Sequence, residues 1–353
     1  GKKVGESPFR KLQSWLHRRT KTGSSSTSRG EVWQRLPETA QDQADLAFWE
    51  KDILPHWEEK RSDSKVKQRF LAGIPPSLRG VLWPAAIGNS LGLDGEVFEQ
   101  LRSEVIKEHE VALQMAALSG EGLTSDSQRQ AGGGHSYQIE KDLTRTFASL
   151  AFFSEGGPFH EDLRTVLSIY AKFRPDMGYV QGMSYLAATL LLYMEAYPAF
   201  VCLANILSQK LLLSLYRLDV ELLATVFRFY DEVVLANSKQ LHQHFKRLNV
   251  TPDMYVVDWL LTLFSRPLNL DVASRVWDAY IIEGELYIIQ AAVGVLKYYE
   301  SELLESSFEG VLTLLNKLPS VEEAELMQHI NAVTISRRQC TQFYDALSHM
   351  GYG

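Results

Sequence analysis

Apolar side chains recur every three or four residues along almost the whole chain from Thr39 onward, and this spacing constrains the fold more than any other feature. It places the apolar groups on one face of an α-helix. Alternating runs rich in Val, Ile and Thr, which are typical of strands, are nearly absent. Since 45% of the 353 residues are hydrophobic, the chain can bury a large core. The sequence predicts an all-α fold, with about 14 to 16 helices at the usual mean length.

The helical spacing is clear in segments that are spread over the chain. They are residues 97–118, 160–173, 183–197, 199–216, 221–236, 253–266, 270–282, 285–305 and 308–317. Ahead of them, Gly73-Ile74-Pro75-Pro76 breaks the pattern, and a new helix is expected to start at Ser77. Between the first two segments, the polar and Gly-rich stretch 119–134 predicts a mobile loop. Its three consecutive glycines are not followed by Gly-Lys-Ser/Thr, so they do not indicate a phosphate-binding loop.

The charge is distributed unevenly along the chain. The net charge is −7, but residues 1–36 carry nine Lys or Arg and two Glu, so that segment is +7 and the remainder is −14. An acidic body argues against nucleic-acid binding. The polar residues 20–30 favour disorder, and we expect residues 1–30 to form a basic, disordered arm. Phe9, Leu12, Trp15 and Leu16 lie at helical spacing within it, so binding to an anionic membrane or a partner is the alternative.

Location follows from what the sequence lacks. Cys202 and Cys340 have no zinc-ligand spacing and suggest a reducing compartment. No apolar run reaches about 18 residues, the length of a membrane span. Residues 1–20 have no apolar stretch of the kind found in secretory signals. We therefore expect a cytoplasmic protein, with peripheral association with intracellular membranes if the arm binds them.

Two short segments carry the candidate chemistry, residues 139–145 (IEKDLTR) and 178–183 (GYVQGM). On a helical wheel, Ile139, Leu143, Phe147 and Leu150 share one buried stripe, while Arg145 lies outside it with Asp142 as its i−3 neighbour. An Arg that neutralises the transferred phosphoryl group and a Gln that orients the attacking water are what GTP hydrolysis needs. A chain that offers both without a nucleotide-binding loop is typical of a GTPase activator.

The Gln belongs to a region where helix breakers cluster. Arg174-Pro175-Asp176-Met177-Gly178 predicts a loop between two helices. Gln181 follows it, just before the helix that is expected to start near Ser184. Gly182 would allow close approach of a partner's backbone, and Tyr179 is either a contact for the partner or a half-buried aromatic anchor.

Three further segments complete a pattern: residues 73–83 (GIPPSLRGVLW), 258–264 (DWLLTLF) and 275–278 (RVWD), the last followed by Glu283-Gly284. In this order the five segments resemble the signature of TBC domains, the GTPase-activating proteins for Rab GTPases. The resemblance covers roughly residues 65–340. It implies a multi-helix fold of two helical subdomains, with the catalytic groups on the N-terminal one. The implied division is a lead-in helical segment at 31–64 and a TBC domain at 65–345, split near residue 215.

The resemblance also implies roles for individual residues. Arg145 would be an arginine finger and Gln181 a glutamine finger, both supplied in trans to a Rab GTPase in its GTP form. Supporting residues would be Asp142, Arg79, Tyr179 and Gly182, and residues touching the partner would be Gly178, Met183 and Arg174. GTP and Mg²⁺ would be carried by the partner, so no cofactor of its own and no metal site is expected. The implied setting is vesicle trafficking.

Other interpretations stay open from the residues alone. The chain is either an enzyme activator or a non-catalytic module, which binds a small GTPase or acts as a helical adaptor. Arg79 and Trp83 fit fold support equally well, and Asp258, Trp259, Arg275, Trp277 and Asp278 favour a structural cluster over chemistry. No Gly-x-Ser-x-Gly element occurs, no nucleophile accompanies His135 or His160, and His242 and His244 are poorly spaced for a metal.

Overall fold

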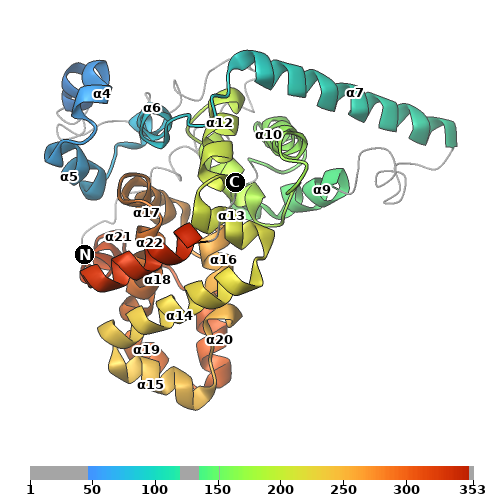
Figure 1. Ribbon diagram of the computed structural model, residues 1–353. Helices are drawn as coiled ribbons and strands as arrows, with labels where there is room; N and C mark the ends of the chain where they lie inside the picture. Colours follow the sequence, from blue (N-terminus) through green and yellow to red (C-terminus); the bar gives the residue numbers. More distant parts are fainter. Residues whose placement is uncertain (1–46, 120–134, 151, 350–353) are drawn as a thin grey trace, which may run out of the picture. The chain divides into compact units, whose positions relative to one another are not determined.

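A computed structural model describes residues 47–119, 135–150 and 152–349 (Figure 1). These residues form 18 α-helices and no strand, which confirms the all-α prediction. The count exceeds 14 to 16 because several helices are only one or two turns long, such as α4 (Trp57–Lys60), α16 (Val256–Leu261) and α19 (Glu300–Glu305). The basic arm and nearly all of the Gly-rich stretch 119–134 lie outside the described residues.

The described residues divide into two compact units, one that lies within residues 47–61 and 75–206 and the other within residues 62–74 and 207–349. The boundary therefore falls earlier than the predicted residue 215, and a short N-terminal segment belongs to the second unit. Arg275 explains that assignment, because its guanidinium donates to the carbonyls of Phe70 and Leu71 at the end of α5 (Ser64–Ala72). The N–H of Ile74 also donates to Asp278, at 3.2 Å.

In the first unit, α10 is the central helix. It packs against three others, which are α7, α9 and α11, and its apolar stripe of Leu163, Val166 and Leu167 is fully buried. The helix predicted at 160–173 is thus the element against which α9 and α11 both pack, and these two helices flank the candidate residues. The elements of this unit are η1 (Phe48–Ile53), η2 (Leu54–His56), α4, α6 (Pro76–Ile87), α7 (Gly95–Ser119), α9 (His135–Arg145), η3 (Ala148–Leu150), α10 (His160–Phe173), α11 (Met183–Leu191) and α12 (Ala196–Leu207).

The second unit is built around α18, which packs along α21. Gly294 permits this close approach, because a Cβ there would lie 2.5 Å from the Cα of Ile330. The elements of this unit are α5, α13 (Lys210–Arg217), α14 (Val220–Asn237), α15 (Lys239–Leu248), η4 (Pro252–Met254), α16, α17 (Leu270–Glu283), α18 (Leu286–Tyr298), α19, α20 (Phe308–Asn316), α21 (Glu323–Asn331) and α22 (Arg337–His349).

Some predicted helices are interrupted. The segment 253–266 holds α16 but ends it at Leu261, since Leu263 and Phe264 adopt left-handed backbone angles. The segment 285–305 divides at Tyr299 into α18 and α19. Buried apolar side chains are present on both sides of each break, such as Leu260 and Phe264 at the first and Leu296 and Leu303 at the second, so the periodicity continues although the helix does not.

Part of the expected structural cluster forms in the second unit, around Arg275, Trp277 and Asp278. Asp258 is half-exposed and pairs with Arg266 instead, at 2.5 Å. Trp277 is fully buried and its indole donates to the carbonyl of Leu263 at 2.9 Å. Asp278 is fully buried and lies 3.9 Å from Arg275. The described residues contain no group of His, Cys, Asp and Glu side chains that is arranged to hold a metal ion. Among them, too, no single helix is long and apolar enough to cross a membrane, and only α12 and α13 taken together reach that length and composition.

Candidate functional site

The helix that carries the candidate Arg ends at that residue. Ile139 and Leu143 are buried as predicted, but α9 stops at Arg145. Phe147 has a φ of 48°, which a right-handed helix does not permit, and a single 3₁₀ turn follows at Ala148–Leu150. The expectation that the buried stripe continues through Phe147 and Leu150 is therefore wrong. The consequence is that Arg145 stands at a helix C-terminus, where a cation is favoured by the helix dipole.

Arg145 reaches the surface while it is held from beneath by a buried carboxylate. Its Nη2 lies 2.5 Å from Oδ1 of Asp142, and the side chains are 50% and 1% exposed. The contact is an ion pair between an exposed guanidinium and a buried carboxylate. The Arg head is thus tethered on one side and open on the other.

The same carboxylate reaches the second candidate segment. The hydroxyl of Tyr179 donates to Oδ2 of Asp142, and Tyr179 is buried. Burial first, and then the hydrogen bond to Asp142, raise the pKa of Tyr179 well above its usual value. The phenol therefore remains a protonated donor at neutral pH. Asp142 joins α9, which ends in Arg145, to the loop that contains Gln181.

The start of α11 holds the end of α9. The hydroxyl of Thr146 donates to the carbonyl of Asp142 at 2.6 Å and lies 2.8 Å from the hydroxyl of Ser184. The hydroxyl of Tyr185 donates to the carbonyl of Arg145 at 3.3 Å. These contacts supply partners for backbone groups that a helix end leaves unpaired. Ser184 and Tyr185 of α11 were not among the predicted site residues, and their only signal in the sequence is their position directly after the GYVQGM segment.

The loop before Gln181 is stiffened by a pair within it. Arg174 donates through Nε and Nη2 to the two carboxylate oxygens of Asp176, each at 2.8 Å. This bidentate bond raises the pKa of Arg174. The N–H groups of Met177 and Gly178 donate to the carbonyl of Arg174, at 3.0 and 2.7 Å. The guanidinium predicted to touch a partner is therefore already engaged within the loop, and it orders that loop.

Two glycines frame the Gln residue. Gly178 and Gly182 have φ values of 64° and 104°, in the left-handed region that other residues avoid. Between them Gln181 is exposed, and no described residue hydrogen-bonds to its amide. Met183 is fully buried and its sulfur accepts the N–H of Val180 at 3.4 Å. The side chain of Met183 thus supports the loop and leaves no surface for a partner.

Arg79 lies on α6 and is buried. Its guanidinium donates to the hydroxyl of Tyr193 at 3.0 Å and lies 5.8 Å from the ring centre of Trp83. These contacts fit the fold-support interpretation of Arg79 and Trp83. Support of the catalytic groups by Arg79 stays a prediction.

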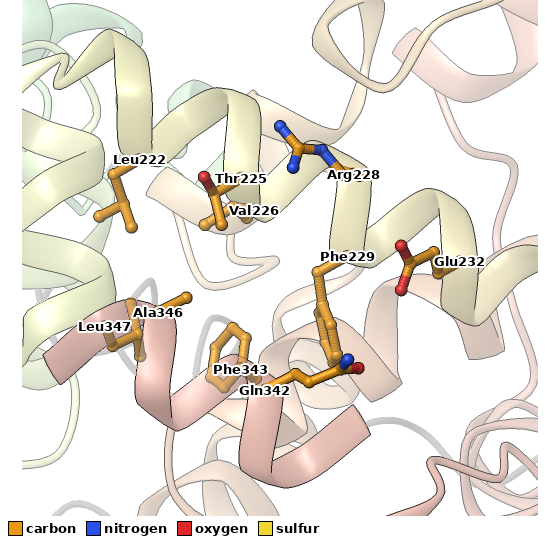
Figure 2. Close-up of a pocket in the computed structure, with 10 residues that line it drawn as sticks. All are labelled: Leu222, Thr225, Val226, Arg228, Phe229, Glu232, Gln342, Phe343, Ala346 and Leu347. Atoms are coloured by element: carbon orange, nitrogen blue, oxygen red, sulfur yellow. The ribbon is translucent and has the colours of Figure 1, made fainter. Parts of the chain in front are cut away.

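A pocket of about 150 Å³ occurs in the second unit, between α14 and α22 (Figure 2). Figure 2 shows Phe229 and Phe343 approaching each other across it, with ring centres 4.9 Å apart. None of the residues predicted for the site lines this pocket. Arg145 and Gln181 therefore do not belong to this pocket.

Comparison with known proteins identifies the family. Residues 76–304 match the sequence model of the Rab-GTPase-TBC domain. The chain belongs to the Rab-GTPase-TBC domain family. The match includes Arg79, Asp142, Arg145, Tyr179 and Gln181, so every predicted site residue lies inside the family's domain.

Relatives and solved structures agree with this membership of the Rab-GTPase-TBC family. TBC1 domain family member 12 of Rattus norvegicus is 36% identical over 308 residues, which is 86% of this chain and 44% of the relative. TBC1 domain family member 14 of Homo sapiens is 36% identical over 285 residues, 78% of this chain and 40% of the relative. The chain thus spans less than half the length of these relatives. The crystal structure of the Ypt/Rab-GAP domain of Gyp1p shares the fold, with a TM-score of 0.60 at 17% identity, covering 89% of this chain and 100% of that one.

The bond between Tyr179 and Asp142 predicts an asymmetric effect of removing a hydroxyl. Tyr179→Phe should lower the free energy of unfolding by about 1–3 kcal/mol, because it leaves a buried carboxyl oxygen without its donor. The matched control is Tyr287→Phe, since the hydroxyl of Tyr287 is also buried but has no hydrogen-bond partner among the described residues. That variant should be unchanged or slightly more stable. Thermal denaturation of both variants checks this, and equal losses would contradict the assigned bond.

Proposed function

We propose that this chain accelerates GTP hydrolysis by a Rab-type GTPase and supplies Arg145 and Gln181 to the partner's active site. The observation that carries the proposal is the buried Asp142–Tyr179 bond, which fixes the segment ending in Arg145 to the loop containing Gln181. Both candidate groups are exposed, whereas the residues that hold them are buried. Burying a carboxylate costs free energy, and here the buried carboxylate orients an exposed Arg. This arrangement fits an Arg that acts on a partner better than an ordinary solvated surface pair.

Each side chain has the chemistry its role requires. A guanidinium offers five N–H donors in a planar fork and keeps its charge at all relevant pH values, so it can neutralise negative charge that develops on the transferred phosphoryl group. Since Asp142 contacts Nη2, the remaining edge of the Arg145 fork can turn to phosphate oxygens. The amide of Gln181 contains both an acceptor and a donor. Its carbonyl oxygen can accept a hydrogen bond from the attacking water and so orient that water, in place of the GTPase's own Gln.

Catalysis in this proposal is positioning and electrostatic stabilisation. GTP and Mg²⁺ are carried by the partner, so the chain has no cofactor of its own. The partner is a Rab GTPase in its GTP form, in line with the family to which the chain belongs and with its likeness to the Ypt/Rab-GAP domain of Gyp1p. In this proposal the acceleration of GTP hydrolysis takes place in the cytoplasm and at the membranes that Rab proteins occupy, as part of vesicle trafficking.

Removal of the Arg should abolish most of the acceleration. We expect Arg145→Ala to reduce stimulated hydrolysis by roughly 10³- to 10⁵-fold, the usual worth of an arginine finger. Arg145→Lys keeps a cation beside Asp142, and with it the fold, but lacks the planar fork, so it should also fail. Lys141→Ala is the matched control, because Lys141 is an exposed cation one turn earlier on α9. Single-turnover hydrolysis measures all three, and normal rates with Arg145→Lys would remove Arg145 from the mechanism.

Replacement of the partner's own Gln tests the second group. A Rab whose intrinsic catalytic Gln is changed to Leu should still respond substantially to this chain, because Gln181 orients the water. Gln181→Ala should be strongly impaired on the unmodified Rab, while Gln100→Ala, an exposed Gln on α7, should be normal. The same single-turnover assay is suitable. If the altered Rab ceased to respond and Gln181→Ala remained active, the chain would supply only an Arg.

We further propose that the basic arm at residues 1–30 tethers the chain to anionic membrane, a role that is separate from catalysis. Each Lys or Arg near such a surface contributes on the order of 1 kcal/mol, and salt weakens the attraction. Deleting residues 1–30 should reduce cosedimentation with acidic liposomes and leave hydrolysis by a soluble Rab unchanged. Binding that is equal with and without the arm, or insensitive to salt, would favour a merely solvated arm.

A further inference from the structure

His135, the first residue of α9, contacts the loop that leads to Gln181. Its Nδ1 lies 3.2 Å from the backbone nitrogen of Tyr179. A backbone N–H can only donate, so Nδ1 must be the unprotonated, accepting nitrogen of a neutral imidazole. The tautomer is therefore determined by the contact itself, and the proton lies on Nε2.

The imidazole also occupies space beside the preceding residue. A Cβ at Gly178 would overlap the Cε1 and Nε2 atoms of the His135 ring. Gly178 is buried, although His135 is exposed toward solvent on its other side. The ring thus covers the loop where it turns through a left-handed residue, and only glycine fits beneath it.

Helix α9 consequently holds Tyr179 at two points. His135 binds its backbone N–H, and Asp142, seven residues and about 10 Å further along the helix, accepts from its phenol. Gln181 follows two residues later. A segment fixed at both its main chain and its side chain has little freedom to tilt, so the direction in which Gln181 leaves the loop depends on both contacts.

We propose that His135 is a positioning residue for Gln181, acting through the backbone of Tyr179 and the surface of Gly178. This inference rests on the proposed function, in which Gln181 orients the attacking water. His135 itself touches neither nucleotide nor water in this account. Its contribution is to narrow the orientations of the Gln181 loop, which matters in the transition state more than in the binding of the partner.

The test compares three residues at one position. In His135→Asn the acceptor Oδ1 is separated from Cα by the same number of bonds as Nδ1 of the histidine. His135→Ala has no acceptor. In single-turnover hydrolysis at a saturating concentration of this protein, the rate with His135→Ala should be about three- to tenfold lower, which corresponds to the loss of one hydrogen bond. The half-saturating concentration should change little, and His135→Asn should recover most of the rate. Equal rates for all three would overturn the proposal.

Amide hydrogen exchange separates this inference from the proposed function. Exchange at Tyr179 should accelerate in His135→Ala and not in His135→Asn, while the Leu163 amide, bonded to the Phe159 carbonyl at 3.0 Å, serves as the reference. Unchanged protection at Tyr179 in His135→Ala would overturn the positioning role. If no Rab responded to the wild-type chain, the proposed function would fail, and the exchange result would still decide whether His135 fixes the loop.

Discussion

A single buried carboxylate determines the arrangement of this site. Asp142 is 1% exposed, and a carboxylate in that position is costly unless its oxygens find partners. One oxygen lies against the Arg145 guanidinium and the other accepts from Tyr179. Because loss of either partner would leave a buried negative charge uncompensated, the end of α9 and the loop before Gln181 are held together.

The backbone near this carboxylate leaves Arg145 and Gln181 exposed at the surface. The left-handed residue Phe147 ends α9 just after Arg145, and Gly178 and Gly182 turn the opposing loop on both sides of Gln181. Beneath them α10 is the platform. Its Arg164 donates to Glu140 of α9 at 2.5 Å through Nε, and it also contacts the Nε2 of the buried His160 at 3.0 Å. Burial lowers the pKa of Arg164, but the hydrogen bonds and charges of Glu140 and Glu161 outweigh it and raise that pKa overall.

Local patterns in the sequence were sufficient for the helical class and for part of the site. The spacing of Ile139 and Leu143 correctly indicated the buried face of α9 and left Arg145 outside it. The i−3 position of Asp142 correctly indicated its pairing with Arg145, since that contact lies within one helical turn. The family was recognisable because its short segments occur in a fixed order.

Contacts between distant residues were beyond the reach of those patterns. Tyr179 and Asp142 are 37 positions apart, and nothing in either local sequence specifies their bond. The end of α9 was missed because an apolar Phe147 continues the periodicity, although its backbone is left-handed. The grouping of residues 62–74 with the second unit was also beyond those patterns, because Arg275 contacts the end of α5, about 200 residues earlier in the chain. Periodicity shows which face of a helix is buried, but it does not show which other element that face packs against.

The central claim is that this surface accelerates hydrolysis and does more than bind a GTPase. The most direct measurement is GTP hydrolysis by a panel of purified Rab GTPases, each assayed with and without this chain and each also tested for binding in its GTP form. We expect at least one Rab to hydrolyse GTP orders of magnitude faster in the presence of the chain. Binding to Rab·GTP without acceleration of any member of the panel would contradict it.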